Sequence, residues 1–410
     1  MPGTAPYCPG TEEEFSYQTK TIIMKQMQIS FTLITAALTF LCFSCNKSGS
    51  DVASETAFAS RAAKGQEATE SNSTGYVYTL SNETSGNRVL AYSRSSAGTL
   101  TYATAYPTGG NGTGGGLGSQ GAVTLSEDNK ILLAVNAGSN SVTSFAVSGG
   151  TLTWISTIAS GGIMPVSVTV HGGLVYVLNG GGSGNISGFT LNEGGVLHLL
   201  PNSTRPLSSS AAGAAQVSFA QDGAVLVVTE KITNKIISYT VNSGGTPGMM
   251  HKITAANATP FGFAVGKKGM LYVSEAAGGA PGASTVSLYH VGTKGMISLI
   301  KGPVAAGQTA ACWVVLTNNE KYVYATNTGS NNLSSFTASA GMLSLLGAAV
   351  ASREMSAPLD AALSNNSKFL YVLNSGTESI TALSVSNDGS LHFLQDVAGL
   401  PDGSAGLAAK

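Results

Sequence analysis

Charged residues are scarce in this chain of 410 residues: Lys, Arg, Asp and Glu make up 10% of it, and the formal net charge is −1. No cluster of Lys or Arg stands out, so the electrostatic signature of a nucleic-acid-binding protein is missing. Histidine is also rare, with five residues in the chain, and no His/Cys group has the spacing of zinc ligands. The sequence therefore gives no support for a nucleic-acid partner or a zinc centre.

Cysteine is equally rare, and the four residues are unevenly placed at Cys8, Cys42, Cys45 and Cys312. Three of them lie near the N-terminus, so the folded part keeps a single thiol and cannot form an internal disulfide. We expect Cys312 to be a small buried core residue.

Long apolar runs are missing apart from residues 29–43, a run that is short for a membrane span. Lys25 precedes this run, and Phe43-Ser44-Cys45-Asn46-Lys47 ends it. A positive charge, a short apolar run and a small residue before a cysteine resemble a bacterial lipoprotein signal, with Cys45 as the acylated residue. A plain secretory signal and an uncleaved anchor are the alternatives.

Residues 1–45 are therefore predicted to be a lipoprotein-type signal region, with translation beginning at Met24 or Met27. We expect an exported bacterial protein that is attached to the cell envelope through a lipid on Cys45, with no other contact to the membrane. Residues 46–74 are rich in Ser, Ala, Thr, Glu and Asn without apolar periodicity, and we interpret them as a flexible linker.

Glycine is abundant, with 52 residues, and it accompanies an internal repeat that begins near Gly75. Six ungapped fourteen-residue units each combine a short apolar strand, a polar turn and a β-branched or aromatic strand, which is the pattern of a hairpin. They are V-T-L-S-E-D-N-K-I-L-L-A-V-N (123–136), V-S-V-T-V-H-G-G-L-V-Y-V-L-N (166–179), V-S-F-A-Q-D-G-A-V-L-V-V-T-E (217–230), G-F-A-V-G-K-K-G-M-L-Y-V-S-E (262–275), V-V-L-T-N-N-E-K-Y-V-Y-A-T-N (314–327) and A-A-L-S-N-N-S-K-F-L-Y-V-L-N (361–374).

A third and a fourth strand follow each unit after Gly-rich turns, and four strands in roughly 43 to 55 residues is the period of a propeller blade. Residues 76–81 match a second strand without a first, and residues 405–409 match a first strand without a second. We therefore predict an all-β, seven-bladed β-propeller over residues 75–410, with four-stranded blades and one blade closed by the N- and C-terminal strands.

The last position of each repeat unit is the first candidate for a functional site. It holds Asn136, Asn179, Glu230, Glu275, Asn327 and Asn374, with Ser81 in the split blade. Asn at such a position commonly shapes a turn. The two glutamates lie in adjacent blades and are expected at one end of the channel, where carboxylates suit general acid or base chemistry.

Other candidates lie on loops that lead into the innermost strands of the same face. Arg205 is expected to clamp an anionic group, or alternatively to form a loop salt bridge. Gln308 and Trp313, with Asn179 and Asn327, are the predicted substrate-binding residues, and inter-blade packing is the alternative role for Trp313. No histidine is expected to be placed for catalysis, and His171 is expected in a turn at the opposite face. The stretch 109–118 lacks the strand-helix context of a phosphate loop.

Several motifs carry a resemblance to a known family. The segments L-Y-V-S-E, Y-V-Y-A-T-N-T-G-S and L-Y-V-L-N-S-G resemble the lactonase family of seven-bladed propellers, which includes bacterial 6-phosphogluconolactonase and fungal carboxymuconate-lactonizing enzyme. The resemblance covers nearly all of residues 75–410. Further segments, at 227–231, 274–284, 310–315 and 401–409, resemble an exported bacterial branch of it.

The resemblance implies a site at the channel mouth built from Arg, Glu and His. Glu230, Glu275 and Arg205 are its expected counterparts by residue type and face, and the histidine has no equivalent. The first hypothesis is a hydrolase or isomerase acting on a lactone or sugar acid without a cofactor. The second is a non-catalytic cell-surface propeller that binds a glycan or protein. The third is a lactonase or esterase assisted by a calcium ion on Glu and Asn oxygens.

Overall fold

The computed structural model describes residues 75–339, 341–350 and 357–410, and these residues form one compact unit built from antiparallel sheets. The predicted signal region 1–45 and linker 46–74 lie outside the described residues. Within the described ranges, no helix is long and apolar enough to cross a membrane.

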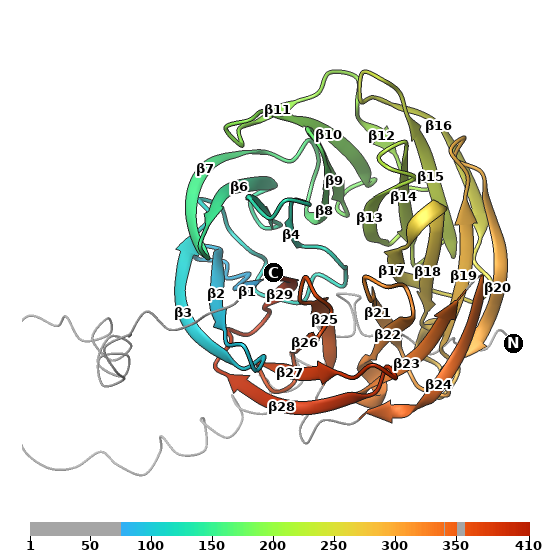
Figure 1. The fold of residues 1–410 in the computed structure, drawn as a ribbon. Helices are drawn as coiled ribbons and strands as arrows, with labels where there is room; N and C mark the ends of the chain where they lie inside the picture. Colours follow the sequence, from blue (N-terminus) through green and yellow to red (C-terminus); the bar gives the residue numbers. More distant parts are fainter. Residues whose placement is uncertain (1–74, 340, 351–356) are drawn as a thin grey trace, which may run out of the picture. The chain divides into compact units, whose positions relative to one another are not determined.

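Seven sheets are arranged radially around a central axis, as the sequence repeat predicts (Figure 1). Blades one to three consist, from the centre outward, of β29 (Ala405–Ala409), β1 (Gly75–Leu80), β2 (Arg88–Arg94) and β3 (Leu100–Pro107); of β4 (Val123–Leu125), β5 (Ile131–Asn136), β6 (Ser141–Ser148) and β7 (Thr151–Ala159); and of β8 (Pro165–His171), β9 (Leu174–Asn179), β10 (Asn185–Leu191) and β11 (Leu197–Leu199), with the short β12 (Arg205–Pro206) also on β10.

The remaining blades follow the same order. Blades four and five are β13 (Ala214–Ala220), β14 (Val225–Glu230), β15 (Lys235–Val241), β16 (Pro247–Thr254) and β17 (Pro260–Val265), β18 (Met270–Glu275), β19 (Thr285–Val291), β20 (Ile297–Ala305). Blades six and seven are β21 (Ala311–Leu316), β22 (Tyr322–Asn327), β23 (Asn332–Ser339), β24 (Met342–Val350) and β25 (Pro358–Leu363), β26 (Phe369–Asn374), β27 (Ser379–Val385), β28 (Leu391–Ala398). Three single turns of 3₁₀ helix, η1 (Lys267–Gly269), η2 (Ala277–Gly279) and η3 (Thr328–Ser330), lie in the connections.

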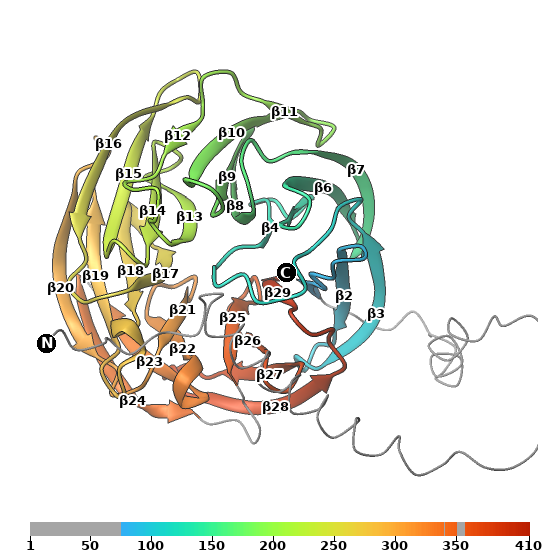
Figure 2. The same ribbon diagram turned by 180° about the vertical axis from the view of Figure 1, so that it is seen from behind.

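Both ends of the propeller meet in blade one, which confirms the predicted split blade. The C-terminal β29 is the innermost strand and pairs antiparallel with β1, with Tyr78 opposite Ala408. The backbone N–H of Lys410 donates to the carbonyl of Tyr76 at 2.9 Å. The C-terminus therefore lies near the centre of the ring in both views (Figures 1 and 2). This pairing leaves no open inner edge at which the ring could come apart.

Neighbouring blades are joined by a recurring hydrogen bond. It explains why several repeat units have a tyrosine in their second strand. The phenol of Tyr78 donates to the carbonyl of Gly150 in the next blade, and Tyr324 donates in the same way to Gly389. Tyr176 and Tyr371 repeat the contact, and Ser144 and Ser238 replace the phenol at two further interfaces.

The acceptor in each of these contacts is a turn glycine that packs against the preceding blade. Gly150 has a φ of 91°, and a Cβ there would come within 2.0 Å of the Tyr76 ring. Both its left-handed backbone and the close approach therefore require glycine. The Gly-rich turns that suggested a propeller from sequence are the points where one blade contacts the next.

The connection from β3 to β4 runs into the central channel, where it is visible in both views (Figures 1 and 2). The Gln120 side chain donates to the carbonyl of Val314 at 2.8 Å and accepts from its N–H at 3.1 Å, as a paired strand would. The backbone N–H of Gln120 donates to Ala215, and Ser119 contacts Val166 and Trp313. This segment, residues 117–121, is the channel plug: it ties blades three, four and six together across the axis.

Candidate functional site

The repeated Asn at the end of each second strand serves as a buried connector within its blade. Asn136 is fully buried and donates to Ser141 and Thr143, which lie two residues apart on the neighbouring β6. Asn179, Asn327 and Asn374 are equally buried and donate to side-chain oxygens at the start of their own third strands. Ser81 instead accepts a hydrogen bond from the backbone N–H of Arg88.

Glu275 occupies the same slot in blade five and is fully buried. Its carboxylate accepts hydrogen bonds from Thr285 at 2.6 Å, Ser287 at 2.7 Å and Tyr289 at 2.7 Å, which alternate along β19. The side chain is one carbon longer than Asn, so it reaches a third hydroxyl. Burial raises the pKa of Tyr289, and the adjacent Glu275 carboxylate adds to the effect.

Glu230 lies in the corresponding slot of blade four and is also fully buried, but its surroundings differ. The third strand of this blade has Lys235 and Ile237 where the other blades have hydrogen-bonding partners. Glu230 turns instead to the loop before β13, where its carboxylate accepts from both the backbone N–H and the hydroxyl of Ser208. It also accepts from Thr233, in the turn between β14 and β15, at 2.5 Å.

Arg205 lies on the outer part of blade three, because its segment forms β12 on β10 rather than a free loop. Its guanidinium donates to the carbonyls of Asn202 at 2.9 Å, Thr204 at 2.9 Å and Pro247 at 2.6 Å. Pro247 begins the outer strand of blade four, so Arg205 links two blades at their periphery. In the described part of the chain, no hydrogen bond or ion pair joins Arg205 to Glu230 or Glu275.

The predicted substrate-binding residues also have protein partners. Gln308 accepts a hydrogen bond from Asn332 at 2.9 Å, next to Asn327. Trp313 is only 4% exposed; it donates to the carbonyl of Ser119 at 2.8 Å and packs on the Phe261 ring at 4.7 Å. The structure therefore places Trp313 in the inter-blade packing under the channel plug. Cys312 is buried, as expected.

A polar crater of about 540 Å³ lies at the opposite end of the propeller. It is formed by the first-to-second strand hairpins of five consecutive blades, each of which brings polar side chains to the rim. They include Glu127 of blade two, His171 of blade three, Gln221 and Asp222 of blade four, Lys267 and Lys268 of blade five, and Glu320 of blade six. The crater is larger than the groove of about 330 Å³ between β20 and β24.

His171 is the histidine of this crater, and its ring is fixed on three sides. Its Nδ1 lies 2.7 Å from the Glu127 carboxylate, so Nδ1 carries the proton and donates it. One face packs against Phe219 at 5.7 Å. The ring edge lies over Gly223, where a Cβ would come within 2.7 Å of Nε2. With the proton on Nδ1 held by Glu127, Nε2 is the ring nitrogen left to accept a proton, and His171 lines the crater.

Two lysines bring positive charge to the same cavity. Lys267 lies 3.8 Å from Glu320, whereas Lys268 is exposed and adopts a left-handed backbone with a φ of 53° at the tip of its hairpin. The acidic groups of the crater do not assemble into a metal site: within residues 75–339, 341–350 and 357–410 no group of three or more His, Cys, Asp or Glu side chains could hold an ion.

Sequence reasoning placed His171 at this face but assigned it no role. The signal that could have found it is the succession of polar hairpin tips, with charged or imidazole side chains at Glu127, His171, Asp222, Lys268 and Glu320 in five consecutive repeats. The structure does not bring Arg205, Glu230 and Glu275 together in either described cavity.

Several solved structures are similar to this chain over most of its length. The chain is similar in structure to a putative 6-phosphogluconolactonase of Bacteroides fragilis, with 18% identity, a TM-score of 0.65 and coverage of 84% of this chain and 100% of the other. A putative 6-phosphogluconolactonase of Bacteroides uniformis has 18% identity, a TM-score of 0.66 and coverage of 82% and 99%. A periplasmic gluconolactonase of Pseudomonas aeruginosa has 16% identity, a TM-score of 0.64 and coverage of 81% and 99%.

These likenesses at low identity establish the fold. No curated protein matches the sequence. The sequence profile of the family described as "Lactonase, 7-bladed beta-propeller" matches residues 68–206 and 293–405, which is more than half of the chain. The chain therefore belongs to the lactonase family of seven-bladed β-propellers.

Proposed function

We propose that this protein hydrolyses a lactone of a sugar acid in the polar crater, with His171 as the general base. The observation that carries the proposal is the 2.7 Å contact between His171 and Glu127 at the rim of a cavity large enough for a sugar ring. A carboxylate on Nδ1 fixes the tautomer in which Nε2 accepts a proton. The crater supports this role better than the opposite face, where Glu230 and Glu275 are buried and bonded to protein groups.

The reaction needs a general base, a positive charge for the carbonyl oxygen and a group that orients the base, and the crater supplies a candidate for each. Nε2 of His171 removes a proton from water while the water oxygen bonds to the lactone carbonyl carbon. The ammonium of Lys268 stabilises the negative charge that develops on the carbonyl oxygen. The ring C–O bond then breaks, and the leaving oxygen takes the proton back from His171, which gives the open hydroxy acid. Glu127 acts as a positioning residue on the imidazole.

The proposal is tested with gluconolactone as the probe, measured against spontaneous hydrolysis. His171→Asn is expected to lower kcat by about 100-fold or more, since general-base catalysis supplies about two to four powers of ten. Lys268→Gln is expected to lower kcat/KM, and Glu127→Gln to lower kcat with little change in KM. All three positions are exposed or half-exposed, so unfolding temperatures should stay nearly unchanged.

Two matched variants serve as controls for these substitutions. His198→Asn changes a histidine that is exposed on the outer strand β11, and Lys368→Gln changes an exposed lysine on a hairpin outside the crater lining. Both should keep wild-type turnover. Equal activity of His171→Asn and wild type across a panel of sugar lactones would refute the assignment of the base.

One observation favours a second candidate, a non-catalytic propeller that binds a sugar or glycan. The Glu127 side chain is 69% exposed, so the pair is not shielded from water as most catalytic dyads are. A polyhydroxylated ligand needs only the hydrogen-bonding groups of the crater. Saturable binding that Lys268→Gln weakens, without turnover in any variant, would support this function.

A further inference from the structure

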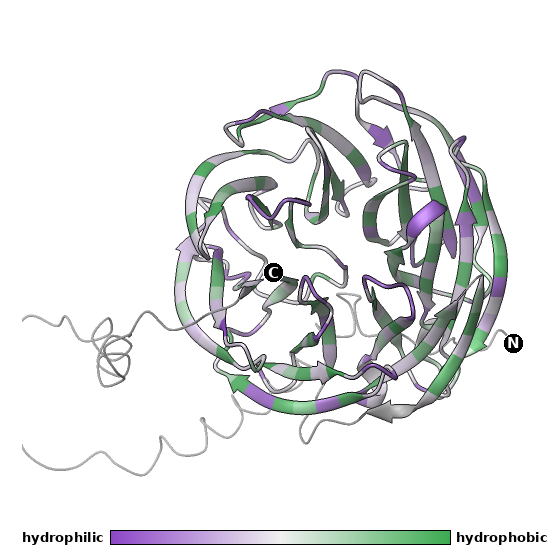
Figure 3. Cartoon of the chain, viewed as in Figure 1, coloured by the Kyte–Doolittle hydropathy of each residue, from purple (hydrophilic) through white to green (hydrophobic). Residues whose placement is uncertain are grey.

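The outer edge of blades four to six differs from the rest of the rim. Thirteen large hydrophobic side chains are exposed in the described part of the chain, and seven of them lie on this sector. They are Met249 on β16, Met296, Leu299 and Ile300 on and before β20, and Met342, Leu345 and Leu346 on β24. We name these seven residues the apolar flank. Figure 3 shows hydrophobic colouring reaching the rim at β20.

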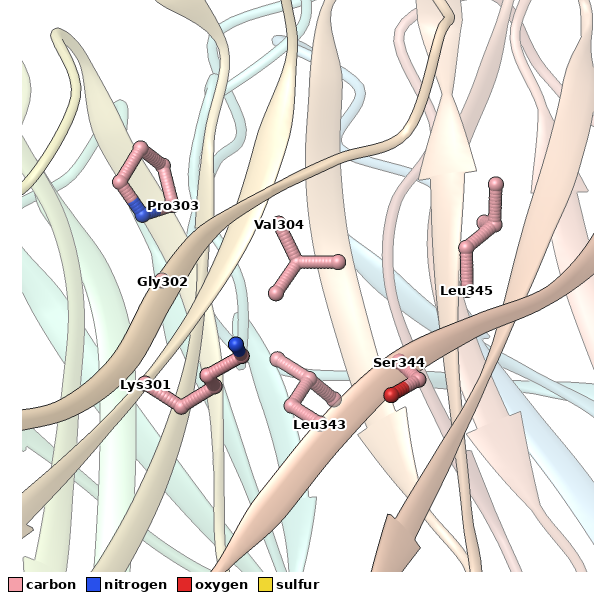
Figure 4. A pocket seen from close by; sticks show the side chains of 7 residues that line it. All are labelled: Lys301, Gly302, Pro303, Val304, Leu343, Ser344 and Leu345. Atoms are coloured by element: carbon pink, nitrogen blue, oxygen red, sulfur yellow. The ribbon is translucent and has the colours of Figure 1, made fainter.

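Two of the three outer strands of the apolar flank, β20 and β24, border a groove. It has a volume of about 330 Å³ and lies between β20 and β24 (Figure 4). Val304 and Leu343 lie between the two strands, and Lys301 lies at one end with its side chain toward them. Exposed apolar side chains that gather on neighbouring elements, with a groove between them, are typical of an interaction surface.

The charges around the apolar flank are of one sign. Lys252, Lys294 and Lys301 are exposed on these outer strands and turns, and the segments 242–254, 292–305 and 341–350 contain no Asp or Glu. Among the described residues, acidic side chains occur in the flanking blades, at Glu193 in blade three and at Asp388 and Asp396 in blade seven, and Glu354 follows β24 in the sequence, outside the described residues. A partner that matches this surface is apolar beneath an anionic layer. Anionic phospholipid bilayers have this chemistry.

We propose that the apolar flank is a membrane-contact surface on which the propeller lies against an anionic bilayer. The sequence-predicted linker 46–74, which follows the predicted acylation site, would permit this contact, because a flexible linker of that length spans about 30 Å on average. A domain of this size has a radius of gyration of about 20 Å, so any side of it is within reach of the bilayer. The hydrophobic side chains and the lysines then select which side makes contact.

The contact is tested by hydrogen–deuterium exchange on the full chain. Measurements are made without lipid, with vesicles of phosphatidylcholine, and with vesicles that also contain phosphatidylglycerol. Backbone amides of β20 and β24 should exchange more slowly with the anionic vesicles only, and raising the salt concentration should weaken this effect. The outer strands β3 and β7 should exchange at unchanged rates, because they carry neither the lysines nor a comparable cluster.

Paired variants complete the test. Ile300→Gln with Leu345→Gln should reduce the vesicle-dependent slowing in β20 and β24 by about tenfold, whereas Tyr102→Gln with Trp154→Gln removes two exposed side chains from β3 and β7 and should leave it unchanged. Equal slowing on all seven outer strands, or none on β20 and β24, would overturn the proposal. Slowing that depends on protein concentration without lipid would overturn it in favour of a contact between two copies of the chain.

Discussion

Asp360 is a buried carboxylate at the point where three parts of the ring meet. It lies on the innermost strand of blade seven with 2% exposure. The backbone N–H groups of Ala361 and of Gly121, which belongs to the channel plug, donate to it, and so does that of Leu407 on the closing strand β29. Burial raises the pKa of Asp360 to about 7, although these three donors act in the opposite direction.

This burial gives Asp360 a defined effect on stability against pH. The unfolded carboxyl loses its proton near pH 3.8 and the folded one near pH 7. Between these values the folded state holds one more proton than the unfolded state, so stability falls as the pH rises through this window and levels off above it. The change is about 1.4 kcal/mol for each pH unit at most.

Asp360→Asn cannot lose a proton, so its free energy of unfolding should lack this slope. The variant is expected to be less stable than wild type at pH 5, where the native Asp360 is protonated, and to close the gap by pH 8. Urea unfolding of both proteins at the two pH values measures the difference, and other titrating groups cancel in the comparison. If the free energy of unfolding changed by the same amount between pH 5 and pH 8 in both proteins, the raised pKa of Asp360 would be contradicted.

At the scale of single residues, the sequence shows which positions of the repeat are special better than it shows which groups those residues bind. The position at the end of each second strand is visible in the repeat, and Asn there was attributed to turn formation. The structure shows that Asn136 bonds across to Ser141 and Thr143 on the next strand. The spacing of five and seven residues recurs after Asn327 and Asn374, so this partner could have been read from the sequence. The approach of His171 to Glu127 could not, because it depends on how two blades stack around the axis.

At the element scale, blades four and five differ although both end their second strand in Glu. In blade five, Thr285 and Ser287 occupy the positions that bind Asn in other blades. In blade four these positions hold Lys235 and Ile237. The same substitution should therefore have different costs in the two blades.

Glu275→Asn should lower the free energy of unfolding by about 1 kcal/mol, since Asn keeps two partners and the Tyr289 hydroxyl loses its acceptor but still accepts from the backbone N–H of Ala256. Glu230→Asn should cost about 2 to 3 kcal/mol, because the shorter side chain loses Ser208 and gains no acceptor on β15. Chemical denaturation of both variants measures the two costs. Equal costs in the two blades would refute this account.

At the scale of the whole molecule, repetition made the fold predictable. Each blade can be recognised in the sequence from its strands and turns, which are local features of the chain. The unmatched strands at 76–81 and 405–409 predict how the ring closes. The channel plug was not predicted, because residues 117–121 have no strand pattern and their contacts come from blades three, four and six. The same holds for the crater, which exists only when five hairpins converge. Export and the lipid on Cys45 stay predictions.

Closure by β29 makes the last strand essential to the entire ring. Deleting residues 401–410 would remove the pairing of β29 with β1 and the contact of Leu407 with Asp360, and would expose the edge of β1 to the channel. Because every blade is held by its two neighbours, the loss spreads beyond blade one. We expect one unfolding transition at a temperature lower by 10 °C or more, as for a loss of several kcal/mol in a domain of this size. Lys410→Ala keeps β29 and the backbone bonds between residue 410 and Tyr76, and it is the control. Differential scanning calorimetry that gave the same midpoint for the deletion and the wild type would refute the role of β29.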